Sequence, residues 1–379
     1  MNKLGIYIHI PFCKKKCKYC DFISFSCLED KQKEYVECLI KEINNKEIDS
    51  KLKKVSTIYF GGGTPSLIDS KYICDILENI KNKFEVSKDA EITIEINPGT
   101  ITKEKLEDYK KVGINRISIG LQSTKDRILE LIGRIHSYEE FLNTYNLVKE
   151  VGFKNINVDL MLAIPTQTEE ELIESVNKLI LLKPNHISLY SLIVEECTEI
   201  DKLISSGELK LIDEKVERKM YWETKRILEK NGYNHYEISN FSKKGFESNH
   251  NMDCWNQEEY IGFGLAAHSY FNNKRFSNTV DLDNYMNNIK NELFEKNIEV
   301  HEKQDKQNKM KEFMMLGLRK IQGIKISDFE QKFRINPLFY FRFEISNLTE
   351  KGLIEVDLDN IKLTKKGLDL ANIVFEEFV

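Results

Sequence analysis

Short segments rich in β-branched residues alternate with longer amphipathic segments over the first 240 residues. In the longer segments, apolar residues recur every three or four positions, which predicts helices. Such an alternation favours an α/β fold with a parallel sheet, and six units predict a partial (β/α)6 TIM-type barrel with its active site at the carboxyl ends of the strands. Strands are expected at 5–10, 55–60, 91–96, 116–121, 156–162 and 186–194, and helices at 29–47, 70–84, 103–112, 138–151, 169–182 and 213–231.

The alternation stops near residue 240, and the remaining chain has a different character. We expect a barrel domain over 1–240, a Gly- and aromatic-rich connecting segment over 241–300, a charged linker around 295–307, and a small domain over 301–379. The order of patterns in the small domain predicts a winged-helix-like α+β fold. Its expected elements are helices at 308–321 and 337–348, two strands within 352–364, and a final helix from Lys365.

Composition limits the classes of partner and the cellular location. The net charge of the 379 residues is −5, with both signs interspersed, so nothing indicates nucleic acid as the main partner. No apolar run approaches the ~18 residues that a membrane span needs, and no signal-peptide pattern precedes the first strand. We therefore expect a cytoplasmic protein. In that reducing compartment the eight cysteines serve as metal ligands or small buried side chains rather than as disulfides.

Three cysteines follow the first expected strand, in the stretch "HIPFCKKKCKYCDF". Cys13, Cys17 and Cys20 have the spacing C-x3-C-x2-C, which is one ligand short of a structural zinc site. Three thiolates on a 4Fe–4S cluster would leave one iron open to a substrate or cofactor. The spacing therefore favours a cluster over a zinc site, and the carboxyl end of a barrel strand is a suitable place for it.

The motif resembles that of the radical S-adenosylmethionine (SAM) superfamily, including the aromatic Tyr19 before the last cysteine. A second motif, "FGGGTPS" at 60–66, is similar to the glycine loop that contacts the methionine moiety of SAM in that superfamily. The resemblance implies that the cluster binds SAM at its open iron and cleaves it to a 5′-deoxyadenosyl radical.

The similarity narrows to the oxygen-independent coproporphyrinogen III oxidase-like family. Blocks such as "EINP", "RISIGLQS", "IGRIHS" and "VDLMLAIPTQT" resemble those of the family in order. Without the resemblance, each matching side chain fits better as an ordinary core, helix-surface or barrel-mouth residue. The resemblance implies SAM contacts by Tyr7, Tyr19, Gly62, Gly63, Thr64, Glu95, Gln122, Arg134 and Asp159.

Within that family, the chain resembles the heme chaperone (HemW) branch more than the oxidases. The oxidases carry a further cysteine where this chain has Phe22, and an N-terminal extension before the first strand. The resemblance implies a protein that binds heme and transfers it to acceptor hemoproteins. It also implies an electron donor such as flavodoxin or ferredoxin, and a homodimer. The alternative is a radical-SAM oxidase that decarboxylates porphyrinogen propionates.

A segment at 250–255, "HNMDCW", resembles the H-N-x-x-Y-W motif that the chaperone branch associates with heme. His250 is the candidate heme ligand, since neutral imidazole is a usual axial ligand of heme iron. Cys254 occupies the tyrosine position and is an alternative ligand as a thiolate. The other interpretation is that His250 and Trp255 pack a loop against the barrel.

Overall fold

A 12-stranded sheet forms the centre of the protein, in a computed structural model that describes residues 2–48 and 53–379. The middle of the sheet is a run of parallel strands, and the six strands predicted from the sequence are confirmed. In order across the sheet, the parallel strands are β11 (Tyr260–Phe263), β1 (Asn2–Ile10), β4 (Lys53–Gly62), β5 (Val86–Ile96), β6 (Arg116–Gln122), β7 (Asn155–Leu162) and β8 (His186–Ser191).

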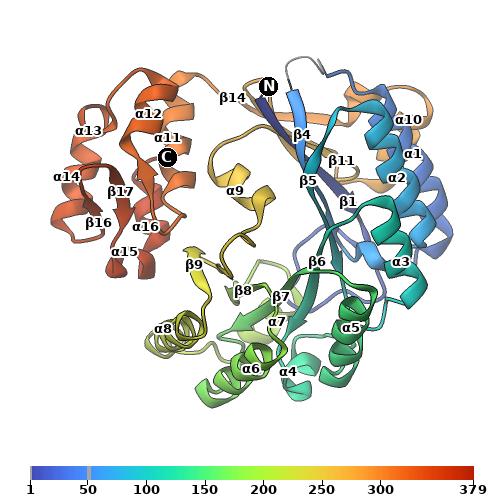
Figure 1. Cartoon of the computed structure of the whole chain (residues 1–379), viewed down its shortest axis with the longest axis horizontal. Coiled ribbons are helices and arrows are strands. Elements are labelled where there is room, and N and C mark those ends of the chain that lie inside the picture. The colour runs from blue at the N-terminus through green and yellow to red at the C-terminus, as the bar shows by residue number, and fades with distance from the viewer. Residues whose placement is uncertain (1, 49–52) are drawn as a thin grey trace.

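Antiparallel strands extend both edges of this parallel run. Beyond β11 lie β12 (His268–Phe271), β13 (Lys274–Asn278) and β14 (Ile298–Lys303). Beyond β8 lie β10 (Asn240–Ser242) and β9 (Asn234–Glu237). Among the described residues the two outermost strands do not pair with each other, so the curved sheet stays open (Figure 1).

Helices cover the outer face of the curved sheet (Figure 1). Local capping sets their ends: Ser137 with Glu140 and Thr168 with Glu171 form capping boxes, and Gly113 ends a helix in the left-handed conformation. These helices are α1 (Gln32–Asn45, after the 3-10 turn η1 at Glu29–Lys31), α2 (Ser70–Lys83), α3 (Lys103–Val112), α5 (Tyr138–Val151), α6 (Glu169–Leu182), α8 (Glu214–Lys230) and α10 (Leu282–Lys290). Two short helices, α4 (Asp126–Leu131) and α7 (Glu199–Ser205), lie at the carboxyl ends of the strands instead, where backbone hydrogen bonds join both segments to Lys18.

The two faces of the parallel strands carry different chemistry. Ile58, Ile94 and Ile119 belong to the main buried core, where full burial of such a side chain contributes about 1.5–3 kcal/mol. Their neighbours along the strands, such as Glu95 and Ser118, line a cavity on the concave side instead. Because side chains alternate between faces, this pattern leaves the inside of the partial barrel polar.

The chain after residue 240 remains part of the same sheet. Strand β11 pairs in parallel with β1. This pairing was not predicted, because the short Gly-rich segment has no clear strand pattern.

The linker predicted around 295–307 is wrong for 298–303, which form the edge strand β14 after the 3-10 turn η3 (Phe294–Asn297). Every side chain of β14 after Ile298 is exposed, so its charged pattern resembles that of a linker. The boundaries at 240 and 300 stay a prediction.

A small domain with its own core follows β14. It combines helices with a three-stranded antiparallel sheet in the order β15-β17-β16, the α+β composition that the sequence predicts. Six phenylalanines dominate its core: Phe313, Phe329, Phe333, Phe341, Phe375 and Phe378. Its elements are α11 (Lys306–Gly317), β15 (Ile324–Lys325), α12 (Ile326–Phe333), α13 (Pro337–Tyr340), α14 (Arg342–Glu350), β16 (Ile354–Val356), β17 (Asn360–Leu363), α15 (Lys365–Asp369) and α16 (Ala371–Glu376).

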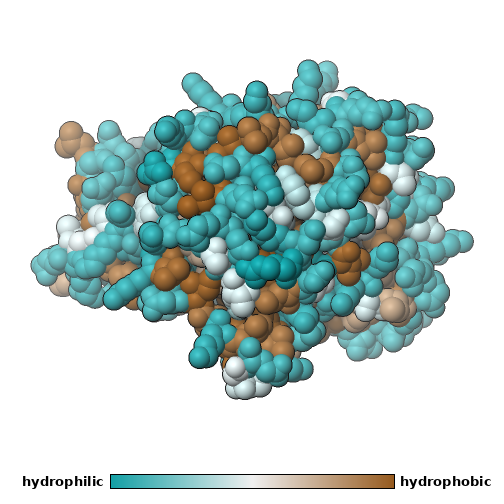
Figure 2. Space-filling view, turned by 90° about the horizontal axis from the view of Figure 1, so that it is seen from below, coloured by the Kyte–Doolittle hydropathy of each residue, from teal (hydrophilic) through white to brown (hydrophobic). Residues whose placement is uncertain are grey.

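The surface is mostly hydrophilic, with apolar side chains in separate patches on the face that Figure 2 shows. No helix among the described residues is both long enough and apolar enough to cross a membrane.

A glycine at the end of β11 allows the backbone to lie close to β1. Gly264 has a φ of +98°, and a Cβ there would lie 2.5 Å from the Tyr35 hydroxyl oxygen and 2.8 Å from the His9 carbonyl oxygen. We expect Gly264→Ala to lower the thermal unfolding midpoint, with an overpacking cost of about 1–3 kcal/mol. The matched control is Gly245→Ala, at a φ of +83° with no heavy atom within 4 Å of the added Cβ. Equal midpoints for the two variants would contradict the close-packing explanation.

Candidate functional site

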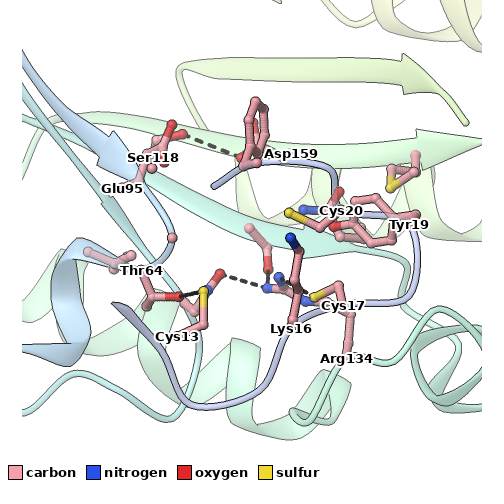
Figure 3. Close-up of a pocket in the computed structure, with 18 of the residues that line it drawn as sticks. Cys13, Lys16, Cys17, Tyr19, Cys20, Thr64, Glu95, Ser118, Arg134 and Asp159 are labelled. Carbon is pink, nitrogen blue, oxygen red and sulfur yellow. Dashed lines mark hydrogen bonds between the residues drawn. The ribbon is translucent and has the colours of Figure 1, made fainter. Parts of the chain in front are cut away.

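A cavity of about 550 Å³ opens at the carboxyl ends of the parallel strands. Its size lies in the usual range for small-molecule and cofactor sites. Figure 3 shows the three cysteine side chains around this cavity, with Glu95, Ser118 and Asp159 across from them. Most of the predicted site residues line it: Cys13, Cys17, Tyr19, Cys20, Gly62, Gly63, Thr64, Glu95, Gln122, Arg134 and Asp159.

Backbone hydrogen bonds hold the cysteine loop in place. The loop lies between the short parallel strands β2 (Phe12–Cys13) and β3 (Phe25–Ser26). Inside it, the Cys20 amide donates to the Cys17 carbonyl at 3.2 Å, and the Lys18 amide donates to the Ile132 carbonyl at 3.0 Å. These contacts place the three thiols at one end of the cavity.

Two side chains donate hydrogen bonds to the thiol sulfurs. The Thr64 hydroxyl lies 3.7 Å from Cys13 Sγ, and Arg134 Nη1 lies 3.7 Å from Cys17 Sγ. Such donors stabilise thiolates, the form that binds metal. Desolvation raises the pKa of Cys20 to about 11, so a bound metal would have to displace its proton. In the described part of the chain, no three His, Cys, Asp or Glu side chains are arranged to hold a single metal ion.

The glycine loop packs directly onto the cysteine loop. The Gly63 amide donates to the Ile10 carbonyl at 2.9 Å, and the Thr64 amide donates to the Phe12 carbonyl at 2.8 Å. A Cβ at Gly63 would lie 2.8 Å from the Phe12 oxygen and 2.9 Å from Cys13 Sγ, so only glycine fits there. The 3-10 turn η2 (Pro65–Leu67) then leads away toward α2.

Two carboxyl groups face the cavity from neighbouring strands. Desolvation raises the pKa of Glu95 to about 7, although the Tyr59 hydroxyl donates to it at 2.8 Å. Desolvation also raises the pKa of Asp159, which accepts hydrogen bonds from Asn157 at 2.7 Å and from Ser118 at 3.5 Å. Carboxylates in this position can accept hydrogen bonds from the hydroxyls of a bound nucleoside.

Gln122 and Arg134 complete the wall beside the carboxyl groups. Gln122 ends β6 with a φ of +74°, an uncommon conformation for a residue other than glycine and one that occurs often at functional sites. Arg134 Nη2 donates to Asn97 Oδ1 at 2.7 Å and to the Gly120 carbonyl at 2.5 Å, while its Nε has no partner among the described residues. That unpaired donor suits the carboxylate of a ligand.

Two predicted site residues do not line the cavity. The Tyr7 hydroxyl makes a 3.1 Å hydrogen bond with His9 Nδ1, and its ring stacks on Tyr59 at 6.3 Å between centroids. His250 is buried, and its Nδ1 makes a 2.9 Å hydrogen bond with Thr57 Oγ1. Desolvation lowers the pKa of His250 to about 4, so the imidazole is neutral.

The segment around His250 closes the opposite end of the barrel from the cysteines. It forms the helix α9 (Asn249–Trp255), whose first amides donate to the Glu91 carboxylate at 3.1 Å. Thr57, the partner of His250, lies four residues before Gly61 on β4, or about 13 Å along the strand. At the other end of α9, the Arg319 guanidinium lies 4.4 Å from the centre of the Trp255 ring.

Cys254 lies in an environment that favours its neutral thiol. Desolvation raises its pKa to about 12, which keeps the sulfur protonated at neutral pH. As at Cys20, a bound metal would have to displace this proton, and Cys254 does not line the cavity of the three cysteines. Ligation of iron by Cys254 stays a prediction.

Sequence reasoning missed several residues that line the cavity. Arg116 begins "RISIGLQS", and its alternation with Ser118 and Gln122 is the signal that could have placed it on the inner face. His136 follows the predicted Arg134 by two positions. Two exposed apolar side chains at the mouth, Ile135 and Ile193, have no comparable signal, because they come from separate loops. They lie at the same opening as Phe22, which the sequence comparison with the oxidases singles out.

Two family models match this chain. Residues 7–179 match the model described as Radical SAM superfamily, and residues 304–370 match the one described as HemN C-terminal domain. The solved structure of coproporphyrinogen III oxidase (HemN) from Escherichia coli aligns with a TM-score of 0.85 at 23% identity, covering 100% of this chain and 90% of that chain. This likeness confirms the predicted fold class.

Full-length relatives narrow the family further. The chain is 38% identical to the heme chaperone HemW of Lactococcus lactis, over 98% of this chain and 96% of that protein. It is 36% identical to the heme chaperone HemW of Bacillus subtilis, over 98% of both proteins. Since identity at this level extends over nearly the whole length of both relatives, this chain belongs to the HemW family of the radical SAM superfamily.

Proposed function

We propose that this protein is a heme chaperone that binds heme and transfers it to acceptor hemoproteins, on a scaffold that holds a 4Fe–4S cluster and SAM. The relatives named heme chaperone HemW support this function over almost the whole chain. Phe22 is the residue that distinguishes this chain from an oxidase, because chaperones and oxidases share the same fold. Where the oxidases have a fourth cysteine, this chain has a phenyl ring that is 63% exposed at the cavity mouth.

The residues around the cavity suit the cluster and SAM. Cys13, Cys17 and Cys20 would hold three irons of the cluster, with Thr64 and Arg134 donating hydrogen bonds to the sulfurs. When bound, such a cluster supplies an electron to SAM at its open iron. This chain's own part is to bind and orient: the close approach of Gly63 to Cys13 keeps the glycine loop beside the cluster site.

The SAM site is proposed along the wall next to the cysteines. The Arg134 guanidinium would take the methionine carboxylate, Glu95 and Asp159 would accept from the ribose hydroxyls, and Tyr19 and Gln122 would complete the wall. The contact between Tyr7 and SAM stays a prediction. The contact between His250 and heme, which the resemblance implies, is an alternative to a heme site at the cavity mouth, and hemin titration of His250→Ala distinguishes the two. We also propose a cytoplasmic location, a flavodoxin- or ferredoxin-type electron donor, and a homodimer, all of which the family resemblance implies.

The cluster assignment predicts that one cysteine substitution removes the iron. We expect Cys17→Ser, after anaerobic reconstitution, to lose the visible absorbance and most of the iron and sulfide, since two thiolates do not hold the cluster. The far-ultraviolet circular dichroism should stay unchanged. The control is Cys74→Ser, at a cysteine of α2 that does not line the cavity. Wild-type iron content in Cys17→Ser would refute the assignment.

The raised pKa of Glu95, about 7, predicts a pH-dependent SAM affinity. The carboxylate, which accepts hydrogen bonds from hydroxyls, dominates at pH 8, and the protonated form dominates at pH 6. We therefore expect the affinity to fall about tenfold from pH 8 to pH 6, measured by calorimetry. In Glu95→Gln the affinity at pH 8 should be lower and the pH dependence weaker. An unchanged pH profile in Glu95→Gln would show that another group titrates.

A paired assay separates the chaperone from the oxidase. We expect the reconstituted protein with SAM and reductant to give a saturable Soret change with hemin and no protoporphyrinogen from coproporphyrinogen III. Repeated turnover of coproporphyrinogen would instead make the protein an oxidase, and would show that a cysteine at the position of Phe22 is dispensable.

A further inference from the structure

Three large apolar side chains surround the mouth of the cavity and are exposed. Phe22 is 63%, Ile135 50% and Ile193 68% exposed, and all three line the same opening. They come from the cysteine loop, the loop between α4 and α5, and the chain after β8. Exposed apolar side chains scattered singly need no explanation, but a group that converges on one opening marks a binding surface.

Cationic side chains border the same mouth. Lys14 and Lys15 are exposed, line the cavity, and have no carboxylate within 4 Å in the described part of the chain. Lys16 extends beside Cys17 and Arg134 (Figure 3). The acidic side chains at this rim are Asp21 and Glu195. Unpaired lysines next to an apolar surface complement a flat apolar ligand that carries carboxylates. Heme, with its two propionates, is such a ligand.

A histidine with an unpaired nitrogen lies in the cavity wall next to Ile135. His136 is 5% exposed, and its Nε2 has no hydrogen-bond partner among the described residues. Desolvation and the nearby charge of Arg134 lower the pKa of His136 to about 3, so the imidazole is neutral. Nε2 has almost no accessible surface, so the ring has to turn toward the cavity to bring a nitrogen to a bound iron. Because Nε2 has no hydrogen bond to lose, the neutral imidazole can make this turn and ligate heme.

His250 lacks these features. Its Nδ1 is paired with Thr57, it stacks on Tyr59 at 5.2 Å between centroids, and it does not line the cavity. Its neighbour Asn251 does line the cavity, so α9 closes the far end of the barrel and forms part of the cavity floor there.

We propose that heme binds across the mouth of the cavity, with its macrocycle on Phe22, Ile135 and Ile193, and with His136 as its iron ligand once the ring turns toward the cavity. The propionates lie at Lys14 and Lys15. This inference rests on the proposed heme-chaperone function and gives that function a site beside the cluster and SAM. It also gives Phe22 a direct role, since the residue in place of the fourth cysteine becomes part of the heme surface.

The test compares hemin titrations of the reconstituted, SAM-loaded protein in the Soret region. We expect Phe22→Asp/Ile193→Asp to weaken hemin affinity at least about tenfold, because two apolar contacts become charged. His136→Ala should lose the low-spin signature of imidazole-ligated iron in electron paramagnetic resonance, and added imidazole should restore it. Hemin dimethyl ester, which lacks the carboxylates, should bind the wild type less tightly than hemin, and Lys14→Gln/Lys15→Gln should remove this difference.

The matched control is Leu358→Asp, which charges a 98% exposed leucine on the small domain and should leave hemin affinity unchanged. Iron, sulfide and SAM affinity, measured on every variant, show whether the cluster site is intact. Wild-type hemin affinity in Phe22→Asp/Ile193→Asp, or lost binding in His250→Ala alone, would overturn the mouth site while leaving the chaperone function standing. Absence of hemin binding by the wild type would reject the function itself.

Discussion

Two backbone hydrogen bonds between the glycine loop and the cysteine loop determine where the chemistry takes place. They join Gly63 to Ile10 and Thr64 to Phe12, at the point where β1 and β4 end side by side. Because the two strands are parallel and in register, their carboxyl ends bring the two loops to the same edge of the sheet. A side chain at Gly63 would separate the loops, since its Cβ would collide with the Phe12 carbonyl and the Cys13 sulfur.

The polar interior of the barrel follows from the same alternation that builds its core. Burial of the charged groups is costly, and the pKa values of Glu95 and Asp159 are raised accordingly. Arg116 is 2% exposed and makes no ion pair within 4 Å in the described residues, although its charge lowers the pKa of both carboxyl groups in part. Such groups reduce stability unless a ligand pairs with them, so the interior is arranged for binding rather than for stability.

The sequence predicts the barrel well because its signals are local. Alternating strands, amphipathic helices and capping residues such as Ser137 lie within a few positions of one another, and the structure has those elements at nearly the predicted positions. The prediction is weaker where pairing partners are far apart in the chain. Strand β11 is only four residues long and pairs with β1 more than 250 positions earlier, while β14 has the exposed charged pattern of a linker.

In the candidate site, too, the residues of local motifs could be predicted, whereas the positions of their side chains in the fold could not. The cysteine spacing and the glycine loop identify the residues of one cavity end, and the structure brings those residues together. A motif does not say which way a side chain faces, however: His250 lies in a motif associated with heme but is paired with Thr57 at the other end of the barrel.

The position after the third cysteine can therefore change two properties at once. A cysteine at position 22 would add a thiol to the cluster loop, whereas Phe22 adds an exposed aromatic ring to the mouth of the same cavity. The ring lies two residues from Cys20, so an apolar ligand bound against it would cover the approach to the cluster site. A substitution at this one position thus couples the ligands available to the cluster with the shape and polarity of its entrance. That coupling is a physical route by which one fold can serve either to transform a porphyrin or to hold one.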